Sequence, residues 1–183
     1  MSLAGYVAVH GENVIVQSVT TAVDARAGMS ETWAQFAALA ASVNPLSGTE
    51  KFINQGLRGE VTAEIILPYQ AGVNEKMRVL TPTEDTTAAA AINDSQTSIT
   101  VASAAGFPTG QDYRIRIDDE LMEITAGHGT ATWTVTRGVD GTTAAPHSSG
   151  AKIERMGIYN ILAAINVRRG ISSVMQLLVR GGA

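Results

Sequence analysis

Apolar and polar residues alternate along much of this chain with the two-residue period of β-strands. The alternation is clearest from Tyr113 to Asp118, where Tyr113, Ile115 and Ile117 share one face and two arginines share the other. Similar segments rich in β-branched residues are separated by turn-forming residues. The expected strands are 12–19, 62–69, 77–80, 98–102, 113–118, 121–126, 132–137 and 151–155. The pattern therefore predicts a mainly β fold.

Three segments deviate from this alternation. Thr20 to Glu31 has little periodicity and indicates a loop or an extended arm. Trp33 to Val43 is ambiguous, because its apolar spacing fits a helical face while its flanks suit a strand. Ser47-Gly-Thr-Glu50 has the spacing of a capping box, in which the two side chains satisfy backbone N–H groups at a helix start. It predicts one short helix there.

The composition favours assembly over catalysis. Charged residues make up 16% of the 183 residues, below the usual ~25%, so much of the surface is expected to be covered by partners. Cysteine is absent, which excludes disulfides and thiolate metal sites. Neither a leader-like N-terminus nor an apolar run of the ~20 residues that a membrane span needs is present. We expect a soluble protein made in the cytoplasm, with no membrane partner.

Charge is distributed unevenly along the chain. Residues 82–156 contain ten acidic and five basic groups, whereas the remainder contains seven acidic and eight basic groups. This shift marks a module boundary and argues against sequence-specific DNA binding, which needs a concentrated basic face. Thr81 to Ala91 is polar and then small, as expected of a connector at the first boundary.

The polar residues do not form a recognisable catalytic or metal-binding motif. His10, His128 and His147 lack metal-ligand spacing, and His147 is expected to pin the turn after Pro146. Asp118-Asp-Glu120 is expected to form a hairpin turn, since it lacks the spacing of a calcium loop. Glycine motifs for nucleotides and a G-x-S-x-G elbow are also missing. The sequence predicts no enzyme, no cofactor and no metal site.

One set of residues resembles the head completion proteins of long-tailed bacteriophages, also called stopper or head–tail joining proteins. The matching residues are Trp33, 40–50, 60–69, 76–79, 157–165 and 173–179. The resemblance implies that Trp33 to Val43 is a strand. It also implies a small antiparallel β-barrel or sandwich with one short helix.

A second resemblance covers the acidic middle of the chain. It is carried by Ser98-Ile-Thr-Val-Ala102, Gly106-Phe-Pro108, Ile115 to Glu120, Thr136 to His147 and Gly150 to Ile153. These residues are similar to a small β module that recurs in phage tail, fibre and other virion proteins. We therefore expect a discontinuous host domain of residues 1–81 and 157–183, with an inserted β domain at 82–156.

The first resemblance implies a structural virion protein of the neck between capsid and tail. Such proteins form an oligomeric ring, here of twelve or alternatively six copies, below the adaptor and portal and above the tail terminator and tail tube. The ring closes the DNA-filled head without reading the DNA sequence, receives the tail, and opens for DNA ejection.

The resemblance also points to a channel gate in Pro45 to Glu60, because the corresponding region projects toward the channel axis. Its named candidates are Ser47, Gly48, Glu50, Lys51 and Arg58. Lys51 and Arg58 would meet the DNA end, and the alternative is a short helix packed on its own subunit. Arg168 and Arg169 form a basic pair that either contacts DNA or an acidic partner or lies in a solvated turn.

Two other functions are compatible with the inserted module alone. One is a tail terminator, tail completion or baseplate component. The other is a carbohydrate-binding module that decorates the virion. Glycan binding uses exposed aromatic platforms, and here Tyr113 and Trp133 are the candidates. Trp133 alternates with Val135 and is expected in the core.

Overall fold

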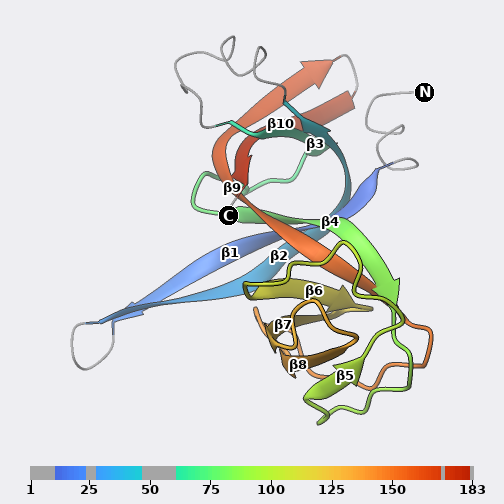
Figure 1. The fold of residues 1–183 in the computed structure, drawn as a ribbon. Coiled ribbons are helices and arrows are strands. Elements are labelled where there is room, and N and C mark those ends of the chain that lie inside the picture. The colour runs from blue at the N-terminus through green and yellow to red at the C-terminus, as the bar shows by residue number, and fades with distance from the viewer. Residues whose placement is uncertain (1–10, 24–27, 47–60, 170–171, 182–183) are drawn as a thin grey trace.

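Figure 1 shows a computed structural model that describes residues 11–23, 28–46, 61–169 and 172–181, with only the backbone described at 168, 169 and 172. The described residues form ten antiparallel strands and no helix. The strands are β1 (Glu12–Val23), β2 (Met29–Pro45), β3 (Ala63–Pro68), β4 (Arg78–Thr87), β5 (Ser98–Thr100), β6 (Tyr113–Ile117), β7 (Glu120–Ala126), β8 (Thr132–Thr136), β9 (Lys152–Arg169) and β10 (Ser172–Gly181). The predicted mainly β class is confirmed.

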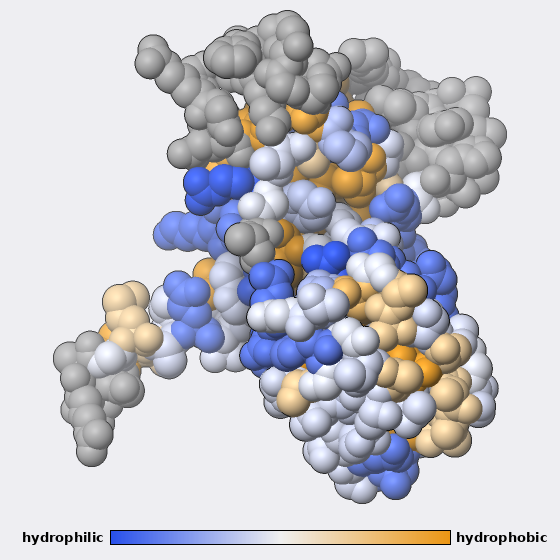
Figure 2. Space-filling model, in the orientation of Figure 1, coloured by the Kyte–Doolittle hydropathy of each residue, from blue (hydrophilic) through white to orange (hydrophobic). Residues whose placement is uncertain are grey.

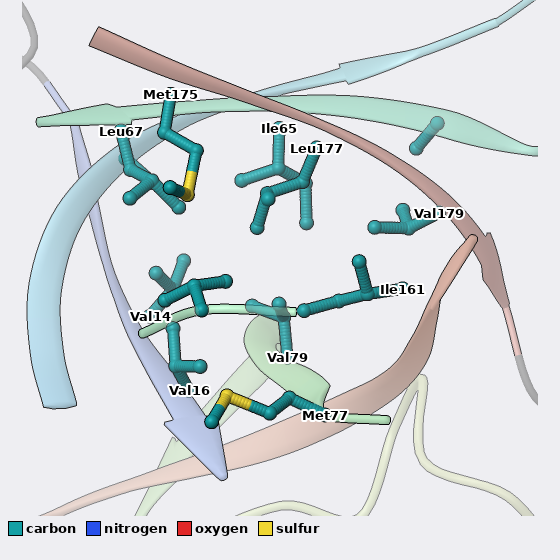
Figure 3. Packing of buried hydrophobic residues seen from close by; sticks show 13 residues of the cluster. Val14, Val16, Ile65, Leu67, Met77, Val79, Ile161, Met175, Leu177 and Val179 are labelled. Atoms are coloured by element: carbon teal, nitrogen blue, oxygen red, sulfur yellow. The ribbon is translucent and has the colours of Figure 1, made fainter. Parts of the chain in front are cut away.

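Six strands form a first closed sheet, the arrangement of a small barrel. The neighbours run β10, β3, β2, β1, β4 and β9, and β9 pairs again with β10. Side chains from all six strands meet inside it, because alternate residues of each strand point inward. Figure 3 shows Val14, Ile65, Val79, Ile161 and Leu177 pointing toward one another in this core.

Strands β4, β9, β6, β7, β8 and β5 form a second closed sheet. It is closed by a bridge between Ala88, just after β4, and Val101, just after β5. Its core contains Trp133, which is fully buried and whose ring centroid lies 5.0 Å from that of Phe107. The burial of Trp133 confirms its prediction as a core residue, and Tyr113, 7% exposed, packs beside it. Neither ring offers an exposed platform for a glycan.

The two closed sheets share the long strands β4 and β9, which pass from one to the other. The register of this pair shifts between Pro82 and Asp85, and a third apolar cluster containing Ile15, Leu80 and Leu121 lies between the two main cores. The first core draws only on residues up to 79 and from 161 onward, and the second only on 88–153. The two main cores therefore draw on different parts of the chain, and the division into a host and an inserted domain stays a prediction.

Strand β4 corrects the predicted connector. Thr81 to Ala91 was expected to be an irregular linker, but β4 continues to Thr87 and pairs with Lys152 to Met156 of β9. Two of the polar residues that suggested a linker, Thr81 and Thr86, are in fact buried. The predicted boundaries therefore lie within two continuous strands.

The structure shows which conformation two of the three deviating segments adopt. Trp33 to Val43 is a strand within β2, which confirms the expectation from the resemblance. Most of Thr20 to Glu31 extends β1 and β2 into one long ribbon, so the loop alternative was wrong for its described residues. The predicted short helix after Ser47 lies outside the described residues.

The hairpin between β7 and β8 depends on a glycine. Gly127 has φ of +79°, and a Cβ placed there would lie 2.2 Å from the carbonyl oxygen of Thr132. We expect Gly127→Ala to lower the free energy of unfolding by about 2 kcal/mol, because the left-handed backbone is strained and the clash is with backbone. Urea denaturation measures this loss.

Gly110→Ala is the matched control for that substitution. It also lies in a loop of the inserted segment, but a Cβ there meets no atom within 4 Å. Its effect should stay within about 0.5 kcal/mol. Equal losses at both positions would contradict the steric argument.

Candidate assembly surface

The ends of the predicted gate segment are held together on the first closed sheet. Ser47, Gly48, Glu50, Lys51 and Arg58 lie outside the described residues. Leu46 precedes them and Thr62 follows them in the chain, and the Leu46 N–H donates to the Thr62 carbonyl oxygen at 3.0 Å. The neighbouring residues Pro45 and Ala63 pair with each other in the sheet. The segment therefore leaves and rejoins the sheet at one place.

The end of β10 fixes the same place from a third strand. The Thr62 N–H donates to the Val179 carbonyl oxygen at 2.8 Å, and the Thr62 hydroxyl accepts from the Gly181 N–H at 2.7 Å. Val61 beside it is fully buried. Three strands, β2, β3 and β10, thus anchor the base of this segment on one rim of the first closed sheet.

The two candidate arginines lie at the other rim. Arg168 and Arg169 are the last residues of β9, and their backbones pair with Ser173 and Ser172 at the start of β10. Ser173 and Val179 are six positions apart in β10, which corresponds to about 20 Å along a strand. The structure therefore does not bring these arginines together with the base of the gate segment.

The ribbon of β1 and β2 extends beyond the body of the protein, as Figure 1 shows. Its strands pair from Glu12 with Ala41 to Val23 with Met29. Only Ile15 to Gln17 of β1 also pair with β4, so the outer part of the ribbon is two strands wide in the described residues. Val23 and Met29 at its outer end are 71% and 74% exposed.

A charged cluster joins the base of the ribbon to both closed sheets. The Arg78 guanidinium lies 4.1 Å from the centre of the Trp33 ring and donates to the Gln17 side-chain oxygen at 2.7 Å. It also donates to Asp140 at 3.0 Å, and Arg114 donates to the same Asp140 oxygen at 3.2 Å. Burial lowers the pKa of Arg78 below its ordinary value even though Asp140 acts to raise it. Arg78 therefore links residues 17, 33 and 140.

A second cluster is centred on the carboxylate of Glu120. One oxygen accepts from Arg137 Nε at 2.7 Å and from the Gly138 N–H at 3.0 Å. The other accepts from Arg137 Nη2 at 2.8 Å and from the Ala145 N–H at 3.0 Å, and it lies 2.9 Å from His147 Nε2. Burial alone would raise the pKa of Glu120, but these hydrogen bonds lower it to about 2.

This low pKa makes stability depend on pH. Glu120 is ionised above its ordinary pKa of 4.5 in both the folded and the unfolded chain, so its contribution is fully present there. As the pH falls from 4.5 to about 2 the unfolded chain takes up the proton first, and about 3 kcal/mol of stability is lost. Urea midpoints measured between pH 6 and pH 2 test this. The pH dependence should be weaker in Glu120→Gln, and an unchanged dependence would contradict the assignment.

The Arg137 to His147 run, singled out in the sequence, joins parts of the second closed sheet. The ring of His147 lies 2.8 Å from Asp118 as well as beside Glu120, so it ties the segment after Pro146 to the hairpin between β6 and β7. Asp118 adopts a φ of 52° in the hairpin turn between β6 and β7, which confirms the predicted turn. Sequence reasoning placed Glu120 in that turn, but Glu120 is buried at the start of β7. Its alternation with Met122 and Ile124 was the signal that it points inward.

Comparison with known proteins identifies the N-terminal part of this architecture. The model of the phage head completion protein family matches residues 12–85, which run from the start of β1 to near the end of β4. No curated protein matches the chain. None of the described residues forms a helix able to span a membrane. The match confirms the resemblance first seen around Trp33 and residues 40–79.

Proposed function

We propose that this chain, in which residues 12–85 match the phage head completion protein family, is a structural part of the head–tail connector of a long-tailed phage. The family match is the observation that carries the proposal, since it implies a structural component of the virion. It spans four of the six strands of the first closed sheet and both anchored ends of the gate segment.

The proposed role is that of a stopper in the neck. Copies of the chain form a ring of twelve, or alternatively six, below the adaptor and portal. The ring closes the DNA-filled head and offers its lower face to the tail terminator and tail tube. Its action is mechanical, and its contact with DNA is independent of sequence.

The gate is proposed to be the segment from Pro45 to Glu60, with Ser47, Gly48, Glu50, Lys51 and Arg58 as its functional residues. Support comes from its base, which β2, β3 and β10 anchor at one rim. Because both ends are fixed at this rim, the segment starts and ends at the same place in every copy. Lys51 and Arg58 give it two cations per copy, and repetition around a ring multiplies their attraction to phosphate.

The opposite rim is proposed to meet a neighbouring component. Arg168 and Arg169 lie there, at the end of β9. Because this rim is ~20 Å from the base of the gate along β10, the two arginines are proposed to contact an acidic partner or DNA separately from the gate. The inserted module is carried on the shared strands β4 and β9, so its position follows that of the first closed sheet.

Cryo-electron microscopy of purified virions tests this proposal. The expected result is a ring of density for this chain between the adaptor and the tail, with residues 45–60 facing the channel. Density at the tail tip or along fibres would overturn the stopper role. A ring in the neck with residues 45–60 facing outward would retain the role and overturn the gate.

A further inference from the structure

We infer that the outer part of the β1–β2 ribbon binds a second copy of this chain, on the surface around Tyr69 and Ile165. The outer ribbon comprises residues 20–23 and 29–32, beyond the contact of Trp33 with Arg78. The inference rests on the proposed function in one respect, which is that the chain assembles into a ring. It adds the contact that joins neighbouring copies.

The outer ribbon has the properties of an element completed by a partner. A two-stranded ribbon is at most marginally stable in water. Here Thr20 to Val23 and Met29 to Thr32 are all exposed, and no described residue pairs along their outer edges. By contrast, the other described strands close into two sheets, which removes free edges. The ribbon therefore presents both backbone hydrogen-bonding groups and side chains to a partner.

The side chains of the outer ribbon fit a protein partner better than DNA. Glu31 is the only charged residue among 20–23 and 29–32, and it is acidic. Phosphate binding needs cations, which these residues do not supply. Val23 and Met29 instead form a directly opposed and exposed apolar pair at the outer end. Figure 2 shows hydrophobic colouring beside the grey tip of the ribbon. Contact with an apolar protein surface would remove this pair from water.

The chain itself carries a surface of matching character. Of the large apolar side chains exposed among the described residues, those beyond the ribbon strands are Tyr69 and Ile165, at 49% and 42% exposure. Tyr69 borders a hollow of about 360 Å³ that is also lined by Val167 and Val174. This hollow lies at the rim of the first closed sheet where β9 meets β10.

The two surfaces of one copy point in different directions. In Figure 1 the ribbon projects away from β3 and β10, whereas Tyr69 follows β3 and Ile165 lies in β9 next to β10. The ribbon of one copy therefore meets this surface on a neighbour. A contact between two different patches of identical subunits is heterologous, and it builds a closed ring when the rotation closes.

Disulfide cross-linking tests this contact, because the chain has no cysteine of its own. Met29→Cys combined with Ile165→Cys should give dimers, trimers and longer ladders on non-reducing gels after mild oxidation. Each single variant can give dimers at most. The matched control is Met29→Cys with Asp94→Cys, since Asp94 is exposed on the inserted module and should give no ladder.

The oxidation is carried out on purified virions and on the concentrated purified chain. The purified chain tests the contact between copies independently of where the protein lies in the virion. A ladder specific to the Met29→Cys and Ile165→Cys pair in either sample supports the inference, even if the chain proves to lie elsewhere in the virion. A ladder absent from both samples, or equal to that of the Asp94→Cys control, overturns it. A cross-link from Met29→Cys to a different virion protein assigns the ribbon to that partner and also overturns it.

Discussion

Glu120→Gln is expected to lower the free energy of unfolding by about 4 kcal/mol, because it leaves the buried Arg137 without a counter-charge. The Glu120 side chain is 1% exposed and that of Arg137 is 7% exposed. The two carboxylate oxygens accept from Arg137 and from the N–H groups of Gly138 and Ala145. An amide NH₂ in place of either oxygen would face two donors, so glutamine cannot satisfy this site despite its similar shape.

Urea denaturation measures this loss, and the fluorescence of the buried Trp133 reports on the same core. Asp119→Asn is the matched control, since Asp119 is exposed in the adjoining turn and should change stability by less than about 0.5 kcal/mol. A loss below about 1 kcal/mol in Glu120→Gln would show that water replaces the carboxylate. Glu120 would then contribute little to the free energy of unfolding despite its burial.

The strands were predictable from the sequence because their signal is local. The period-two alternation from Tyr113 to Ile117 is reproduced by the burial of its apolar residues, and the hairpin turn at Asp118 follows from short-range backbone preferences. The same logic placed Trp133 in a core. Each of these features depends on residues that are neighbours in the chain.

The pairing of strands was less accessible, because it is decided by distant residues. Ile15 pairs with Leu80, and Thr87 pairs with Lys152, across 65 residues in each case. Alternation within one segment does not state which partner it takes. For this reason the polar stretch after Thr81 suggested a linker, although it forms the strand that enters the second closed sheet.

The candidate site shows the same limit. The basic pair Arg168 and Arg169 and the gate candidates were chosen by residue type and resemblance, but only the fold shows that β10 separates their rims. Arg78 was not selected at all, since an isolated arginine has no motif. Its role appears only when Gln17, Trp33 and Asp140 are brought around it.

Asp140→Asn is expected to lower the free energy of unfolding by about 3 kcal/mol. Asp140 is 8% exposed and accepts from both Arg78 and Arg114, which are 11% and 18% exposed. Its φ is 54°, a left-handed conformation that asparagine tolerates well, so the substitution changes the charge and not the backbone. The expected loss is at the lower end for a buried pair because Arg114 keeps its ion pair with Glu123.

A double-mutant cycle that combines Asp140→Asn with Arg78→Leu measures the coupling energy between these two residues. Arg78 belongs to the segment that matches the head completion family, whereas Asp140 lies outside that match, after β8 of the second closed sheet. A coupling of 1 kcal/mol or more, from urea midpoints of the four proteins, would show that the two modules stabilise each other through side chains. A coupling near zero would mean that this ion pair adds nothing to the shared strands β4 and β9 and to the apolar cluster of Leu80 and Leu121, which also join the two closed sheets. Substitutions at this ion pair would then leave the contact between the two closed sheets intact, because the shared strands and the apolar cluster remain.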